Sequence, residues 1–230
     1  MYDKWLNVFE KCALFQGTDE KQLKVMLECL RPRIQSYNKN ETIVTEGEEI
    51  YGVGIMLSGN AAVTKENSEG DRIILDILEP PEMFGEIAVF SKRGVWPATV
   101  TAQANCVVTF LPPEKILGQC EKMCISHKFL LMNMLRIISE KAMNLNRKVE
   151  YLVIKSLRGK ISRLLLDQYK MTGKTTFILP MKRNELADFL NVSRPSLSRE
   201  MCRMRDEGII DFYKSSIRII DLQALRHEAR

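Results

Sequence analysis

Residues 85–99 read GEIAVFSKRGVWPAT and contain the residue types of an anion-binding turn. Gly85 can take backbone conformations closed to other residues, and we expect a glycine-opened turn, a short helix and a loop. The first backbone N–H groups of such a helix can hold a charged small molecule. The segment leaves through Trp96 and Pro97, which offer one indole N–H and no charge. A buried anion needs a cation or several hydrogen-bond donors, and this exit supplies no cation, so the backbone amides of residues 85–87 or Arg93 would have to hold the anion.

A second segment, residues 181–221, has the pattern of a winged helix-turn-helix. It reads MKRNELADFLNVSRPSLSREMCRMRDEGIIDFYKSSIRIID. Ser193 is placed to cap the second helix, and Gly208 to end it. Residues 209–221 are expected to fold back as a two-stranded wing that turns at residues 214–216. The inward positions of the two helices are apolar: Leu186, Ala187 and Leu190 on the first, and Leu197, Met201 and Met204 on the second.

The outward side of the second helix predicts contacts with DNA. Arg199 is predicted to form a bidentate contact with guanine, and Ser198 to reach a base or a phosphate. Residues 150–230 carry 16 positive against 10 negative side chains, whereas residues 1–149 carry 18 against 19. A basic C-terminal third favours a polyanionic partner, although some winged helices bind proteins instead. The predicted DNA-binding residues are Lys182, Arg183, Arg194, Pro195, Ser196, Ser198, Arg199, Arg203 and Lys214.

A heptad pattern precedes this segment. Apolar residues recur at alternating intervals of four and three, which predicts a coiled-coil dimer helix, with a helix buried in its own domain as the alternative. Ser156 could cap a further helix at residues 157–169. The predicted dimer seam consists of Leu131, Leu135, Ile138, Ala142, Leu145, Val149 and Leu152.

The N-terminal half contains two successive kinds of sequence pattern. Residues up to about 30 have helical spacing of apolar residues, and residues 34–111 have short β-branched runs broken by glycines. One hairpin is expected to turn at Gly70. The expected fold is α+β: a double-stranded β-helix (a β-roll or jelly roll), a long dimerisation helix and a winged helix-turn-helix. The expected domains are residues 1–125, 126–154 and 155–230.

The order of these parts resembles the Crp/Fnr family of bacterial transcription regulators. The stretches that carry the resemblance are FGEIAVF, ISEKAMNLNRKVEYL and ELADFLNVSRPSLSRE. The resemblance implies a homodimer on a two-fold symmetric DNA site, with an effector in the β-roll. Many members carry a glutamate where this chain has Pro195, so the base preference that such a glutamate supports is not expected here.

The resemblance also places residues 85–98 at the family's phosphate-binding cassette. Gly85, Glu86 and Ala98 match, but Trp96 replaces the arginine that holds the cyclic phosphate, and Pro97 replaces a serine or threonine. Three interpretations stay open: a pocket for an aromatic or apolar ligand, a site filled as core, and cyclic nucleotide binding. The effector-pocket candidates are Gly85, Glu86, Ile87, Ala88, Trp96, Pro97, Ala98, Leu135, Ile138 and Ser139.

Other chemistry finds little support in the sequence. No Cys-x-x-Cys pair occurs, and Cys120 with Cys124 gives only two soft ligands. The two histidines, His127 and His227, lie outside the β-roll, and no nucleotide loop or nucleophile motif is present. No catalytic residue, metal or cofactor is therefore expected. We expect a cytoplasmic regulator that binds double-stranded DNA as a homodimer, contacts RNA polymerase if it activates, and does not bind membranes. We expect its effector to be an unknown small molecule other than a cyclic nucleotide, with cyclic AMP, thiol redox or no effector as the alternatives.

Overall fold

The computed structural model describes residues 2–66, 69, 72–118 and 125–229, which form two compact units, Met1–Glu140 and Lys141–Arg230. The boundary falls inside one long helix, α4 (Ile125–Val153). The expected division into three domains stays a prediction. Gly70, Cys120 and Cys124 lie outside the described residues. Among the described helices, none is long and apolar enough to cross a membrane.

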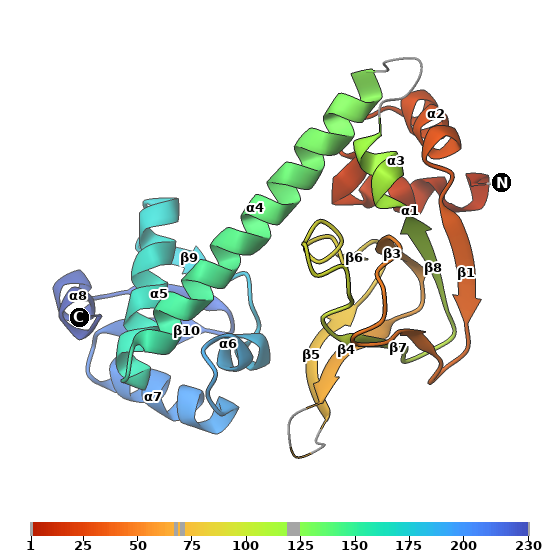
Figure 1. Ribbon diagram of the computed structural model, residues 1–230. Helices are drawn as coiled ribbons and strands as arrows, with labels where there is room; N and C mark the ends of the chain where they lie inside the picture. The colour runs from red at the N-terminus through yellow and green to blue at the C-terminus, as the bar shows by residue number, and fades with distance from the viewer. Residues whose placement is uncertain (1, 67–68, 70–71, 119–124, 230) are drawn as a thin grey trace. The chain divides into compact units, whose positions relative to one another are not determined.

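The N-terminal unit is built on two four-stranded antiparallel sheets that face each other (Figure 1). Their strand orders are β1-β8-β3-β6 and β2-β7-β4-β5, which is the expected double-stranded β-helix. The strands are β1 (Arg33–Tyr37), β2 (Thr42–Val44), β3 (Val53–Ser58), β4 (Ala61–Glu66), β5 (Arg72–Leu78), β6 (Met83–Phe84), β7 (Thr99–Ala102) and β8 (Cys106–Leu111).

The central strands β3 and β8 are buried on both faces, because each face packs against a separate apolar cluster. Val108 and Phe110 of β8 join the cluster between the two sheets, whereas Val107 and Leu111 face a second cluster beneath the N-terminal helices. This is the two-residue alternation of a strand covered on both sides. The edge strand β5 differs, since its residues from Arg72 to Ile77 are exposed.

Short helices cover one end of the roll (Figure 1). Asp19 begins the longest of them with a capping box that includes Gln22. The first turns of α4 join the same cluster through Leu130 and Met134. Asn133 anchors α4 there, because its buried amide donates to the carbonyls of Leu14 and Gln16. The helices are η1 (Asp3–Trp5), α1 (Leu6–Lys11), η2 (Ala13–Phe15), α2 (Glu20–Leu30) and α3 (Pro113–Leu117).

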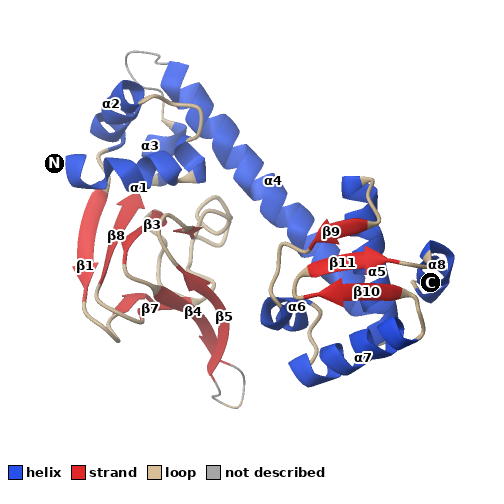
Figure 2. Cartoon of the chain, turned by 180° about the vertical axis from the view of Figure 1, so that it is seen from behind, coloured by secondary structure: helices blue, strands red, loops and turns tan. Residues whose placement is uncertain are grey.

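The C-terminal unit packs the last part of α4 and four further helices against a small antiparallel sheet of order β10-β11-β9 (Figure 2). Ser156 caps α5 as expected, with its hydroxyl accepting from the Gly159 N–H. The wing strands β10 and β11 turn at residues 214–215, one residue shorter than expected. The elements are α5 (Leu157–Thr172), β9 (Thr176–Ile178), α6 (Arg183–Phe189), α7 (Arg194–Asp206), β10 (Ile210–Tyr213), β11 (Ser216–Ile219) and α8 (Leu222–Glu228).

Candidate nucleic-acid interface and effector site

Helix α7 has one buried apolar side and one exposed polar side. Ser193 caps it, with the side-chain oxygen accepting from the Ser196 N–H at 3.3 Å. Leu197, Met201 and Met204 are fully buried against α6 and the sheet, as the spacing predicted. The helix is therefore held by its apolar residues, and its other side is left free for a partner.

The predicted DNA-contacting residues of α7 gather on the side away from that core. Arg194, Pro195, Arg199 and Arg203 are exposed, and Ser196 and Ser198 are half-buried on the flanks. Arg199 donates to the Ser196 hydroxyl at 3.5 Å, and Ser193 donates to the same hydroxyl at 2.8 Å. Arg203 lies 3.5 Å from Glu200. Because these side chains are exposed and their bonds are local, they can turn toward base edges or phosphates.

Arg183 has a different setting from the other predicted phosphate contacts. It is half-buried, its guanidinium lies 5.0 Å from the centre of the Phe212 ring, and it donates to Met201 and to the Lys214 carbonyl. Burial lowers the pKa of Arg183. These contacts join the start of α6 to the wing, so Arg183 fixes the position of Lys214 whether or not it also meets a phosphate.

An ion-pair cluster that the sequence did not reveal ties α5 to α7. Arg158 donates to Glu200 at 2.7 Å and forms a bidentate pair with Glu207 at 2.7 and 2.8 Å. These hydrogen bonds raise the pKa of Arg158 and lower that of Glu207. Glu200 also meets Arg203. The cluster therefore sets the orientation of α7 within the C-terminal unit.

The turn expected to begin at Gly85 is present, but the short helix expected after it is not. Gly85 has a φ of 81°, and the Val89 N–H donates to the Gly85 carbonyl at 2.8 Å. A further turn follows, with the Ser91 N–H on the Ala88 carbonyl, and no regular helix forms.

Trp96 lies in the core between the two sheets, with only 2% of its surface exposed. Its ring packs directly over Gly85, where a Cβ would come 2.5 Å from Cζ3. Phe84 and Tyr51 flank the indole at centroid distances of 5.9 and 6.0 Å. The indole N–H finds no hydrogen-bond partner among the described residues. The position that the family resemblance assigns to a cation is thus filled by an apolar ring.

The other effector-pocket candidates do not share one environment. Glu86 and Ala98 are buried, whereas Ile87 and Pro97 are exposed. Ile138 is half-buried against the cluster under the N-terminal helices, a different cluster from that of Trp96. Leu135 and Ser139 are exposed on α4. Their assignment to an effector site stays a prediction.

The predicted seam of α4 is apolar and largely uncovered. The exposed fractions of Leu135, Leu145, Val149 and Leu152 are 60, 63, 51 and 43%. Leu131 and Ile138 pack partly against the N-terminal unit, and Ala142 is exposed. A stripe of large apolar side chains facing solvent is typical of a surface that binds a partner.

Each of the two units contains a segment that matches a known protein family. Residues 34–123 match the model of the cyclic nucleotide-binding domain, and residues 159–228 match that of the Crp-like helix-turn-helix domain. The chain belongs to the Crp/Fnr family. It is a DNA-binding transcription regulator of the Crp/Fnr type.

Relatives of this regulator are distant in sequence. The cAMP-activated global transcriptional regulator CRP of Pasteurella multocida is 22% identical over 80% of this chain and 88% of its own. A CRP-like cAMP-activated global transcriptional regulator of Mycobacterium tuberculosis is 19% identical over 97% of this chain and 99% of its own. The catabolite activator protein of Thermus thermophilus shares the fold, with a TM-score of 0.55 and 18% identity over 95% of this chain and 98% of its own.

Two cysteines of this Crp/Fnr protein, Cys12 and Cys106, give little support to thiol chemistry. Cys12 is buried, and burial raises the pKa of its thiol to about 11. Burial likewise raises the pKa of Cys106. A thiol with a raised pKa carries little thiolate at neutral pH and reacts slowly. Within the described part of the chain, no group of three or more His, Cys, Asp or Glu side chains could hold a metal ion.

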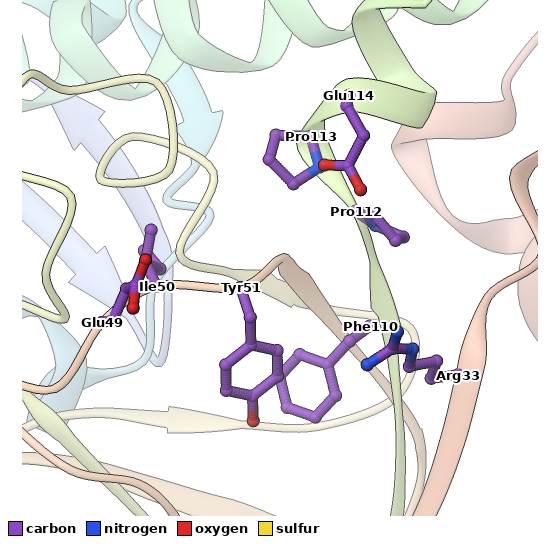
Figure 3. Close-up of a pocket in the computed structure, with 8 residues that line it drawn as sticks. All are labelled: Arg33, Glu49, Ile50, Tyr51, Phe110, Pro112, Pro113 and Glu114. Atoms are coloured by element: carbon purple, nitrogen blue, oxygen red, sulfur yellow. The ribbon is translucent and has the colours of Figure 1, made fainter.

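A cavity of about 510 Å³ opens in the N-terminal unit, and none of the residues predicted for the effector lines it (Figure 3). No local pattern pointed to it, because its residues come from β1, from the segment after β2 and from the junction of β8 with α3. Its lining consists of Arg33, Glu49, Ile50, Tyr51, Phe110, Pro112, Pro113 and Glu114.

Proposed function

We propose that this regulator acts as a homodimer on a two-fold symmetric operator, with α7 of each copy in the major groove. The observation that carries the proposal is the exposed apolar seam of α4, whose heptad spacing suits a second copy of the same helix. Two symmetric copies present two α7 helices. The two half-site centres are then about one helical turn, roughly 34 Å, apart.

Within each half-site, the contacts divide by type. Arg199 reads a guanine, and Ser198 and Ser196 reach a base or a phosphate. Arg194, Lys182, Arg183, Arg203 and Lys214 contact phosphates and set the register. Support comes from the exposure of the other arginines and the two lysines on α7 and around the wing, whereas Arg183, Ser196 and Ser198 are half-buried.

The effector that gates binding is proposed not to be a cyclic nucleotide. Relatives are named as cAMP-activated, so cyclic AMP is the natural alternative. Against it stand the buried indole of Trp96 over Gly85 and the proline that follows. A cyclic phosphate held there would have to displace an aromatic ring and would meet no guanidinium at position 96.

We place this regulator in the bacterial cytoplasm, where it meets DNA directly. If it activates transcription, RNA polymerase is its further partner. An effector-free regulator is the other alternative, and the burial of Trp96 in the core between the two sheets supports it. A thiol-redox mechanism at Cys12 or Cys106 has less support, because burial raises the pKa of both thiols.

The experiment is a selection of bound duplexes from a random DNA pool, with the oligomeric state measured by sedimentation. We expect inverted half-sites about one turn apart and a dimer in solution. Leu145→Glu with Val149→Glu places charges in the seam and should give a folded monomer that loses the paired site. Asn144→Glu, an exposed position of α4 outside the seam, is the matched control. A single unpaired site bound by a monomer contradicts the proposal.

The cyclic nucleotide question needs a direct titration. Trp5→Phe leaves Trp96 as the single tryptophan. We expect no saturable change of its emission with cyclic AMP or cyclic GMP, and no heat of binding by calorimetry. Saturable binding of either nucleotide at micromolar concentration would establish the alternative.

A further inference from the structure

The cavity near Tyr51 has the size of a small-molecule site. We call it the Tyr51 pocket, and its lining is the set of eight residues given above. Its volume of about 510 Å³ suits a ligand of roughly amino-acid to drug size. All eight residues belong to the N-terminal unit, and none of them is among the residues predicted for the cassette site.

The floor of the Tyr51 pocket is a preformed aromatic surface. Tyr51 is 46% exposed, and its ring centre lies 4.8 Å from that of buried Phe110. Trp96 supports Tyr51 from the core side at 6.0 Å. Figure 3 shows the Tyr51 and Phe110 rings next to each other beneath the two prolines. A rigid aromatic surface with an open face offers stacking to a planar ring.

Burial raises the pKa of Tyr51, so its phenol stays neutral at physiological pH. The pocket therefore presents an uncharged aromatic ring at this position.

Charges of both signs surround this floor. Arg33 of β1 is paired in register with Phe110 of β8, which places its side chain on the same face of the sheet. Glu114 comes from the start of α3, and in Figure 3 Glu49 stands on the far side of the two rings from Arg33. None of these three side chains forms an ion pair or hydrogen bond within the described part of the chain.

The combination selects a class of ligand. A carboxylate can form a bidentate pair with the Arg33 guanidinium, and an ammonium on the adjacent carbon can pair with Glu114, whereas Glu49 lies across the two rings from Arg33. An aromatic ring stacks on Tyr51. A simple aromatic acid would leave two carboxylates facing its own charge, and a simple amine would leave Arg33 without a partner. We propose that the Tyr51 pocket binds a free aromatic α-amino acid.

The pocket is directly connected to the segment that carries Trp96. The Ile50 N–H donates to the Gly94 carbonyl, and the Trp96 N–H donates to the Glu48 carbonyl, both at 2.9 Å. The Gly47 N–H returns to the Trp96 carbonyl at 2.9 Å. An amino acid bound against Tyr51 therefore acts on the same segment that the family resemblance marks as the cassette. Binding itself does not depend on the DNA contacts proposed above.

The test is calorimetric titration of the full-length protein, without DNA, with L-phenylalanine, L-tyrosine and L-tryptophan. We expect saturable binding of at least one of them. For the analogues of phenylalanine, 3-phenylpropionate lacks the amine and 2-phenylethylamine lacks the acid, and each should bind about tenfold or more weakly. Absence of heat with all three amino acids at millimolar concentration, or equal binding of either analogue, overturns the proposal.

Two variants assign the site. Arg33→Gln should weaken binding of the amino acid by about tenfold or more and leave that of 2-phenylethylamine unchanged. Tyr51→Leu should weaken binding of all aromatic ligands. Arg226→Gln, an exposed arginine of α8, is the matched control and should bind as the wild type does. Arg33 and Tyr51 are both exposed, so we expect the two variants to fold. Circular dichroism spectra and melting temperatures equal to those of the wild type would verify this. Binding that is unaffected by Arg33→Gln places the ligand elsewhere and overturns the proposal.

Discussion

The ring of Trp96 fills the space that a side chain on Gly85 would need, since a Cβ there would lie 2.5 Å from Cζ3 and 2.8 Å from Cη2 of the indole. Gly85 also has a φ of 81°, which L side chains rarely adopt. The two residues therefore depend on each other: glycine at 85 is what allows a buried tryptophan at 96. In this member of the family, the start and the exit of the cassette close onto one another.

Gly85→Ala should destabilise the N-terminal unit more than a change of backbone freedom alone explains. Gly94→Ala is the matched control, because Gly94 also has a positive φ, of 63°, but nothing lies within 4 Å of a Cβ there. In both variants, a side chain on a residue with positive φ should lower the free energy of unfolding by roughly 1–2 kcal/mol. Gly85→Ala should lose about 1–3 kcal/mol more from overpacking. Urea unfolding followed by Trp96 fluorescence measures the difference, and equal losses would contradict the packing of Trp96 on Gly85.

Arg199→Ala should remove discrimination at one symmetric base pair of the selected operator. The expected loss is about 1–3 kcal/mol at that base pair, with non-specific binding retained. Arg194→Ala is the comparison, because a phosphate contact should weaken binding on all sequences alike and reduce its salt dependence. Competition binding on a set of single-base operator variants measures both. A uniform loss for Arg199→Ala would make it a phosphate contact.

The Arg158–Glu207 pair should make the stability of the C-terminal unit depend on pH. The hydrogen bond from Arg158 lowers the pKa of Glu207 in the folded protein. A lowered folded-state pKa gives stability that is present above the unfolded value, about 4.3, and is lost as pH falls through the folded value.

Glu207→Gln removes the carboxylate that titrates in this pair. We expect it to lower the melting temperature at pH 7, with a difference from the wild type that shrinks below about pH 4. Asp206→Asn, next to it and more exposed, is the control and should show a smaller difference at pH 7. If the melting temperatures of Glu207→Gln and the wild type differ by the same amount from about pH 3 to pH 7, the pair does not make stability depend on pH.

Asn133→Ala should loosen the attachment of α4 to the N-terminal helices. The buried amide donates to the carbonyls of Leu14 and Gln16 at 3.0 and 2.8 Å, and its removal leaves both acceptors without that donor. The expected cost is about 1–3 kcal/mol. Asn144→Ala, at an exposed position of α4, should cost little. Denaturant unfolding compares the two, and hydrogen exchange at residues 13–16 should rise only in Asn133→Ala.

Local patterns in the sequence predicted the elements that depend on local chemistry. The caps at Ser156 and Ser193 and the buried side of α7 are present because each follows from a few neighbouring residues. The heptad spacing likewise predicted one long helix. The prediction of a short helix after Gly85 was wrong, since a turn at residues 88–91 follows before a second helical turn can form.

Contacts between distant parts of the chain were not predictable in this way. Asn133 meets Leu14 across 119 residues, and Arg158 meets Glu207 across 49. The Tyr51 pocket also draws its residues from three separate stretches. β9 was missed because three residues give too short a pattern to read. The sequence alone does not show that Arg158 pairs with Glu207 or that Tyr51 packs against Phe110, because only the fold brings these residues together.

The exposed strand β5 has a practical consequence for work on the N-terminal unit. Ile73, Ile74, Leu75 and Ile77 face solvent on the edge strand of a sheet, where backbone N–H and C=O groups are also open to pairing. A fragment that ends near residue 140 would have this exposed, apolar edge strand, which can pair with the same strand of another copy. We therefore expect such a fragment to aggregate at high protein concentration. Replacing Ile74 or Leu75 by lysine should keep such a fragment soluble for crystals and for NMR.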